Sequence, residues 1–149
     1  MPFDQPSLKG RALRLLSGRE HSRAELERKL QRFEEEPGTL ALALDDLQAK
    51  GFISEQRVVE SVVNRRAAKL GASRIKQELQ AKGLAPELVA QAVVDLRTSE
   101  LARAREVWQK KFDHPPQDAT ERVKQMRFLA SRGFGGDTIH RVVSGAADD

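Results

Sequence analysis

The sequence of 149 residues contains no cysteine and no tyrosine, one tryptophan, and only 5% aromatic residues. Without cysteine, disulfide bonds and thiolate metal sites are excluded. No stretch approaches the roughly 20 apolar residues that a membrane-spanning helix needs, and the N-terminus lacks the apolar core of a signal peptide. We therefore expect a cytoplasmic protein without a membrane segment, whose apolar burial comes mainly from Leu, Val, Ala and six Phe.

Residue groupings that carry catalysis or hold cofactors are also missing. The glycines between residues 133 and 136 do not form a phosphate-binding loop. Each histidine favours a surface or capping role over metal binding, because none has a partner at ligand spacing; the three are His21, His114 and His140. The acidic run at residues 34–36 is typical of a solvated loop. We therefore expect no catalytic residue, metal or cofactor, and predict that the protein is not an enzyme.

What the sequence has in abundance is Ala, Leu, Arg, Lys, Glu and Gln, which are strong helix formers. Apolar residues recur at spacings of three and four, and stop signals such as Pro-Gly and Lys-Gly separate about nine such segments. Several helices have clear start signals, among them a capping box formed by a Ser and the Glu three residues later. The predicted starts are Ser22 with Glu25, Thr39, Ser54, Ser73 and Pro86.

The helices group in threes, which predicts an all-α fold of three tandem three-helix repeats. The predicted repeats cover residues 8–51, 54–97 and 99–143, with flexible tails at 1–7 and 144–149. Internal similarity supports the grouping. The stretch Arg74–Gln77 recurs as Arg122–Gln125, and Lys82–Leu84 recurs as Arg132–Phe134. Two extra residues between these pairs of anchors predict a longer middle helix in the third repeat.

The charge is distributed unevenly along the chain. The formal net charge is only +4, and residues 21–60 carry six basic and nine acidic side chains. Residues 61–85, in contrast, carry six basic side chains and a single acidic one, and residues 101–112 carry four and one. This distribution favours an electropositive surface for a nucleic acid or an acidic protein on the second and third repeats. The alternative is a set of solvated, tolerated surface cations.

Two features of these basic segments bear on binding. Arg65 and Lys69 are four residues apart on one predicted helix, and Arg74 begins the next, where the helix dipole disfavours positive charge. Trp108 and Phe112 lie one turn apart beside two lysines and could form a stacking platform for bases. Core packing is the favoured interpretation of Trp108 and Phe112, because they continue the apolar stripe of their helix.

Four segments of the sequence resemble the RecX family, the regulatory proteins that modulate the RecA recombinase. The matching segments are 12–30, from Ala-Leu-Arg-Leu-Leu to Lys-Leu; Gly51-Phe52-Ile53 with Arg57; 61–83, from Ser-Val-Val-Asn-Arg to Lys-Gly; and 110–139, with Lys-Lys-Phe and Arg-Phe-Leu-Ala-Ser-Arg-Gly-Phe. They span residues 8–143 in the expected order. The resemblance implies an elongated, curved stack of repeats that docks along the RecA–DNA filament and inhibits ATP hydrolysis, strand exchange and co-protease activity.

The resemblance and the charge distribution together give a set of candidate contacts to the RecA filament or DNA. These partner-binding candidates are Arg65, Arg66, Lys69, Arg74, Lys76, Arg103, Lys110, Lys111, Arg127 and Arg132. Direct contact with single- or double-stranded DNA is the weaker expectation. Because no heptad seam is sustained, we expect a monomer. Two modes of inhibition stay open, capping of filament ends and binding in the filament groove.

The main alternative is a stand-alone DNA-binding protein. Residues 73–96 read as a short helix, a tight Gly turn and a second helix, which resembles a helix-turn-helix. Against this interpretation, the second helix begins Pro86-Glu87 and also carries Asp95, and it offers no Arg, Lys, Asn or early Gln to read bases.

Overall fold

The computed structural model describes residues 5–145. Within that range the chain forms nine α-helices and one short 3-10 helix, and no strand. Their bounds are α1 Leu8–Gly18, α2 Arg23–Leu30, η1 Gln31–Phe33, α3 Thr39–Ala49, α4 Glu55–Arg66, α5 Ala72–Ala81, α6 Pro86–Thr98, α7 Glu100–Lys111, α8 Ala119–Ser131 and α9 Gly136–Val143. The predicted tail residues 1–4 and 146–149 lie outside the described residues.

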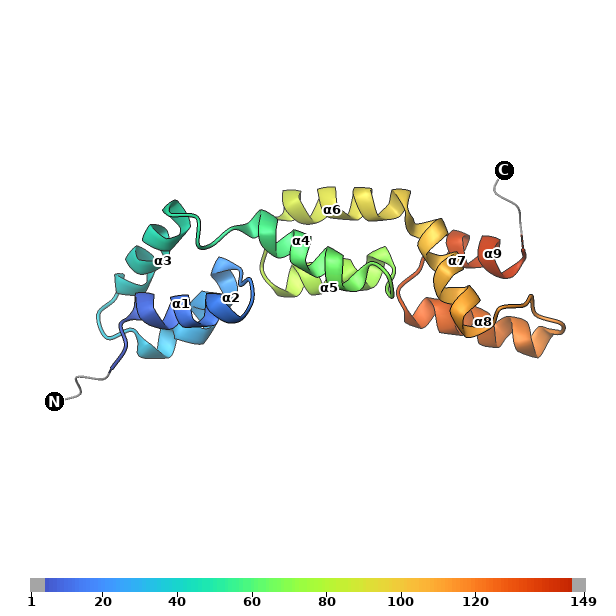
Figure 1. The fold of residues 1–149 in the computed structure, drawn as a ribbon, viewed down its shortest axis with the longest axis horizontal. Coiled ribbons are helices and arrows are strands. Elements are labelled where there is room, and N and C mark those ends of the chain that lie inside the picture. The colour runs from blue at the N-terminus through green and yellow to red at the C-terminus, as the bar shows by residue number, and fades with distance from the viewer. Residues whose placement is uncertain (1–4, 146–149) are drawn as a thin grey trace.

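The helices are arranged as three units in an elongated row (Figure 1). Helices α1–α3 form one unit, α4–α6 the central unit and α7–α9 the last, and the two ends of the chain lie at opposite ends of the row. In this view the row is arched. The all-α prediction of three three-helix repeats is therefore confirmed.

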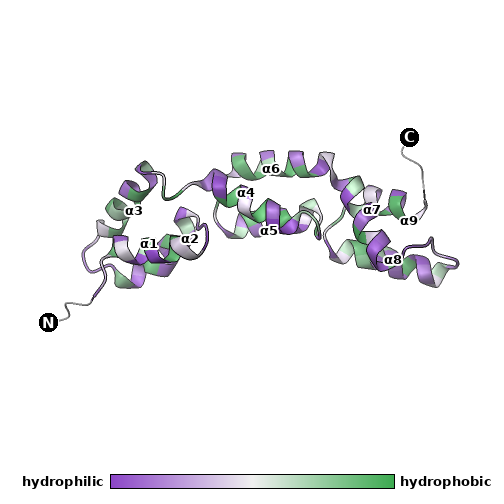
Figure 2. Ribbon diagram, viewed as in Figure 1, coloured by the Kyte–Doolittle hydropathy of each residue, from purple (hydrophilic) through white to green (hydrophobic). Residues whose placement is uncertain are grey.

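Each unit has its own apolar core. Fully buried side chains include Leu26 and Leu44 in the first unit, Ile75 and Leu79 in the second, and Leu129 in the third. Purple and green alternate along every helix in Figure 2, as expected for helices with one buried stripe. Burial of a Leu or Ile side chain stabilises a fold by about 1.5–3 kcal/mol. Because each core contains few such residues, the units need the contacts between them.

Several helix starts follow local sequence signals. The Ser22 hydroxyl accepts a hydrogen bond from the Glu25 amide while the Glu25 carboxylate accepts one from the Ser22 amide, which completes the predicted capping box. Ser54 caps α4, and Pro86 is the first residue of α6, as predicted. Ser7 caps α1 by accepting a hydrogen bond of 2.9 Å from the Gly10 amide.

Two predicted N-caps are wrong, and both are replaced by a carboxylate from elsewhere. Thr39 is the first residue of helix α3 and Gly38 is its N-cap, so Thr39 does not cap the helix. Instead, the Glu34 carboxylate accepts a hydrogen bond of 2.9 Å from the Leu40 amide. Helix α5 begins after Gly71, two residues before Ser73, and the Ala72 amide donates to Glu100 over 2.8 Å. A cap supplied by a distant residue leaves no local signal at the helix start.

The middle helix of the third repeat is longer than that of the second, as predicted: α8 has 13 residues and α5 has 10. The extra residues shift the register of the repeated stretch. Ile75 is buried, whereas Val123, its partner in the sequence match, is 46% exposed. The buried counterpart in α8 is Gln125. The match between Arg74–Gln77 and Arg122–Gln125 is therefore not a structural equivalence, and the Lys-Gly or Arg-Gly helix ends are the better anchors.

Candidate functional site

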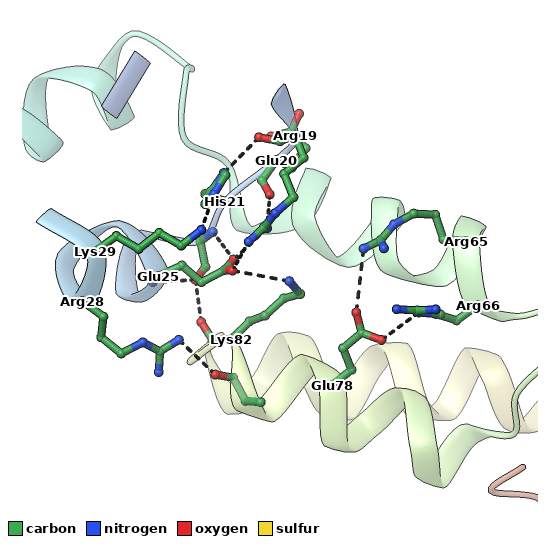
Figure 3. Close-up of polar contacts among 12 residues, drawn as sticks. Arg19, Glu20, His21, Glu25, Arg28, Lys29, Arg65, Arg66, Glu78 and Lys82 are labelled. Carbon is green, nitrogen blue, oxygen red and sulfur yellow. Dashed lines mark hydrogen bonds and ion pairs between the residues drawn. The ribbon is translucent and has the colours of Figure 1, made fainter. Parts of the chain in front are cut away.

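The first group of predicted contact residues lies on the central repeat. Arg65 and Arg66 end α4, and both point at Glu78 of α5 (Figure 3). Arg66 Nε lies 3.0 Å from Glu78 Oε1, and Arg65 Nη2 lies 3.8 Å from Glu78 Oε2. Because one carboxylate faces two guanidiniums that are nearly half exposed, this end of α4 keeps a net positive charge. Exposed pairs of this kind contribute little stability, so the guanidiniums remain open to a partner.

Lys69 lies beyond the end of α4, so the expectation that it shares a helix with Arg65 is wrong. Helix α4 ends at Arg66, and the Lys69 amide donates to the Arg66 carbonyl in the following turn. Its side chain is exposed and has no hydrogen bond or ion pair within residues 5–145. Lys76 is exposed on α5 and lines a shallow hollow with Leu84 and Val89. Both amines are accessible to a partner.

Arg74 and Arg103 are held by the joint between the second and third repeats. Arg74 Nη1 donates to the Ser131 carbonyl over 2.6 Å. Arg103 donates to the carbonyls of Ala67 and Leu70, over 2.9 and 2.6 Å, and to that of Leu96 over 2.9 Å. These carbonyls end α4 and α6 or follow them, where positive charge complements the helix dipole. The guanidinium of Arg103 therefore donates its hydrogen bonds within the molecule, whereas the side chain of Arg74 is exposed.

Glu100 occupies the centre of this joint. Its carboxylate is buried and accepts hydrogen bonds from the Ala72 amide over 2.8 Å, and from the Gly135 amide and the Thr138 hydroxyl over 3.3 Å. The starts of α5 and α9 thus share one acidic cap. The Gly71 amide also donates to the Arg132 carbonyl over 2.7 Å. The start of α5 therefore abuts the end of α8.

The remaining candidates lie on the third repeat, where two of them gather around an aromatic ring. Lys111 Nζ lies 5.6 Å and the Arg132 guanidinium 4.6 Å from the centre of the Phe128 ring, which packs edge-on against Phe112. Both distances allow cation–π attraction. Lys110 and Arg127 are exposed on α7 and α8 and are not part of this group.

Trp108 packs against the core of the third repeat, which confirms the favoured interpretation over a stacking platform. Its Nε1 donates to Gln125 Oε1 over 2.8 Å, and Gln125 Nε2 donates to the His114 carbonyl over 3.2 Å. The buried amide of Gln125 is thus satisfied on both sides, as buried polar groups require.

The joint between the first and second repeats contains residues that sequence reasoning did not single out as a group (Figure 3). Ser22 donates to the Lys82 carbonyl, and Arg28 to the Ala81 carbonyl over 3.1 Å, at the end of α5. Glu25 lies 2.7 Å from Arg19 and 3.5 Å from Lys82. The start of α2 therefore abuts the end of α5, as the start of α5 abuts the end of α8. This contact between distant segments has no signature in the local sequence.

Burial and neighbouring charges at this joint shift two pKa values. Burial raises the pKa of Glu25, but the hydrogen bonds from Arg19 and from the Ser22 amide, with the charge of Lys82, outweigh it and lower the pKa to about 2. Burial lowers the pKa of His21, whose Nδ1 lies 3.1 Å from the Arg19 carbonyl and whose Nε2 lies 3.1 Å from Lys29 Nζ. Because its pKa is lowered to about 2, Glu25 remains ionised at neutral pH.

Two further features are absent from the part of the chain that the structure describes. Between residues 5 and 145, no group of three His, Cys, Asp or Glu side chains is placed to hold a metal ion. No helix in the same range is long and apolar enough to cross a membrane.

Comparison with known proteins identifies the family. Residues 9–47, 54–93 and 98–143 match the models of the first, second and third three-helix domains of RecX. The chain belongs to the RecX family. It is 53% identical over 139 residues to "Regulatory protein RecX" of Leptothrix cholodnii, covering 93% of this chain and 88% of that protein. It is 50% identical over 142 residues to the protein of the same name from Herminiimonas arsenicoxydans, covering 95% and 91%.

The fold is also that of solved RecX structures. The crystal structure of RecX from Lactobacillus salivarius superposes with a TM-score of 0.78 at 19% identity and covers 93% of both chains. A second RecX crystal structure superposes with a TM-score of 0.75 at 17% identity, covering 93% of this chain and 71% of the other. The domain models and the curated relatives confirm the predicted membership in the RecX family, a family of non-enzymatic regulators known as inhibitors of RecA activities.

Proposed function

We propose that this RecX-family chain inhibits RecA by binding the RecA nucleoprotein filament through the exposed cations of its second and third repeats. The observation that carries the proposal is the placement of these cations along two of the three units in the row. Arg65 and Arg66 end α4 and Lys69 follows it. Arg74 and Lys76 lie on α5, Lys110 and Lys111 on α7, Arg127 on α8, and Arg132 directly after α8. An elongated molecule with charge spread along it contacts a filament at several points and gains affinity from each.

Four of the proposed contacts are side chains whose donors are free. Lys69, Lys76, Lys110 and Arg127 are exposed and have no hydrogen bond or ion pair inside the described chain. Lys and Arg suit the carboxylates of a protein surface and the phosphates of bound DNA. Arg103 is proposed to act indirectly, because its guanidinium holds the joint between the repeats that present the other cations.

The test is the hydrolysis of ATP by RecA on single-stranded DNA, measured with and without this protein. We expect hydrolysis, strand exchange and co-protease activity all to fall. The triple variant R65Q/R66Q/K69Q should inhibit less than the parent, because each lost contact removes some binding energy. Glutamine is preferred to glutamate here, since new carboxylates would repel Glu78.

A matched control removes three exposed cations that are not proposed contacts, in the variant K50Q/R97Q/R141Q. It changes the net charge by the same amount, so equal loss in both variants would indicate a general charge effect. Unchanged hydrolysis with the parent protein over a range of salt would refute the proposal. The ratio of this protein to RecA at half-inhibition distinguishes capping of filament ends from occupation of the groove.

Direct contact with single-stranded DNA is a second candidate, favoured by the cations around Phe128. The ring is only partly buried, with Lys111 and Arg132 beside it. Partly exposed aromatic rings with neighbouring cations can stack on bases and bind phosphates. Affinity for oligothymidine should then fall with salt and with R132Q. Absence of any binding at low salt would refute this second candidate.

We also propose that the chain is a monomer, which sedimentation equilibrium can test.

A further inference from the structure

The first repeat contains an open hollow of about 970 Å³ between α1 and the segment formed by α2 and η1. Its apolar lining comes from Leu15, Leu30 and Phe33. Its polar lining is almost entirely cationic, although this repeat has more acidic than basic residues. The cations are Arg11, Arg14, Arg28, Lys29 and Arg32.

These five cations lack carboxylate partners. Within residues 5–145, none of them forms an ion pair, although other cations of the same repeat do. Lys9 Nζ lies 2.6 Å from Asp46, and Arg23 Nη1 lies 2.6 Å from Asp45. The acidic residues of the repeat are therefore used on other faces, and the groove keeps its positive charge. No acidic residue lines this hollow.

The arrangement has a cost in the isolated protein. Arg28 and Arg32 are four residues apart, and Arg11 and Arg14 are three apart, so like charges face one another along α1 and from α2 into η1. Like charges at these spacings are destabilising by a few tenths of a kcal/mol per pair. A bound anion would relieve this repulsion. The charge and shape together therefore indicate a binding groove for a negatively charged partner.

The apolar lining indicates which kind of anion fits. The guanidiniums of Arg11 and Arg32 lie 3.7 and 4.7 Å from the centre of the Phe33 ring. Both distances allow cation–π attraction, which holds the two guanidiniums against the ring at the side of the hollow. The floor formed with Leu15 and Leu30 can receive an aliphatic side chain, while the planar guanidiniums donate paired hydrogen bonds to carboxylates in bidentate geometry.

We propose that this groove binds an acidic peptide segment with aliphatic anchors, supplied by a protein partner. The neighbouring hollow, which shares Arg11, Arg32 and Phe33, has Glu35 and Glu36 at its edge. The acidic part of the peptide therefore lies in the first hollow, over Arg14, Arg28, Lys29 and Arg32, and away from Glu35 and Glu36. The proposal concerns a surface of the first repeat and does not rest on inhibition of RecA.

The test is fluorescence anisotropy with the full-length protein and three labelled probes, in the absence of RecA. The first probe is a peptide of roughly 12 residues, rich in Asp and Glu, with two Leu four positions apart. The second replaces both Leu by Ser at the same charge, and the third is an oligothymidine of similar length. The protein variants are R14E/R32E, which alters the groove, and R97E/R141E, which places the same charge change on α6 and α9.

We expect the Leu peptide to bind the parent protein, and R14E/R32E to weaken it by about tenfold or more. R97E/R141E should stay within about twofold of the parent, and the Ser peptide should bind more weakly than the Leu peptide. Circular dichroism melting checks that each variant is folded, and R14Q/R32Q replaces the reversal if it is not.

Several outcomes would overturn the proposal. Equal affinity of the peptide for the parent and R14E/R32E would show that the groove is not its site. Oligothymidine binding that needs Arg14 and Arg32, with no peptide binding, would make the groove a nucleic-acid site. A chain that begins at Gln5 and binds the peptide about tenfold tighter would identify residues 1–4 as the occupant. Equal binding of Leu and Ser peptides would reduce the groove to a general charge patch.

Discussion

Replacement of Glu100 by alanine should uncouple the second and third repeats. The carboxylate is 4% exposed and is the shared acceptor for the Ala72 amide, the Gly135 amide and the Thr138 hydroxyl. Alanine would leave two backbone amides at helix starts without this acceptor. It would also remove a negative charge from the positive ends of two helix dipoles.

The magnitude follows from these contacts. A hydrogen bond to a charged group contributes about 1.5–3 kcal/mol, and a buried donor left unpaired costs about 1–3 kcal/mol. The Ala72 contact is 2.8 Å long and counts fully, whereas the two contacts of 3.3 Å are weaker. We therefore expect E100A to lower the free energy of unfolding by about 3–4 kcal/mol. E100Q keeps one acceptor oxygen but replaces the other with an amide NH2 group, which cannot accept a hydrogen bond, so roughly half of that loss is expected.

Urea denaturation followed by circular dichroism measures the loss, and amide hydrogen exchange locates it. Exchange at Ala72 and Gly135 should accelerate in E100A, whereas amides in the first repeat should change little. The matched control is E87A, which removes an exposed carboxylate from the first turn of α6 and should cost at most about 1 kcal/mol. If E100A unfolds within about 0.5 kcal/mol of the parent with unchanged exchange at Ala72, this account of the joint is wrong.

Three further predictions concern the joints and the third core. The pKa of Glu25 is lowered from 4.5 to about 2, so the ionised carboxylate stabilises the folded state fully above pH 4.5, and this contribution is lost as the pH falls toward 2. The difference in unfolding free energy between the parent and E25Q should therefore shrink over that range. G133A should lower the melting temperature of the protein more than G51A does. Both glycines have positive φ, but a Cβ at Gly133 would lie 2.7 Å from Arg74 N, whereas a Cβ at Gly51 would meet no atom within 4 Å. Equal melting temperatures would contradict the close packing of this joint. W108F leaves the Gln125 oxygen without its donor and should cost about 1–2 kcal/mol in urea denaturation; no cost would contradict the contact.

The sequence by itself determined the helices and their grouping. Amphipathic spacing, the Ser22 capping box and Pro86 act within a few residues, so they can be read along the chain. Membership in the RecX family was also readable, because matching segments occur in order over most of the chain. The candidate contacts could be proposed only from the distribution of charge along the chain. The sequence does not show which Lys and Arg side chains already form hydrogen bonds or ion pairs within the protein.

Tertiary structure decided what depends on residues distant in the chain. Glu100 replaces Ser73 as the determinant of the start of α5, and Arg103 is engaged with three carbonyls of the joint. Because aromatic residues are few and cysteine is absent, the three cores are small, and the joints add stability through polar contacts that no local pattern encodes. The first repeat has an acidic composition, yet it carries a groove whose cations have no carboxylate partner within the described chain. Pairing in space, not the count of charges, determines where a surface is positive.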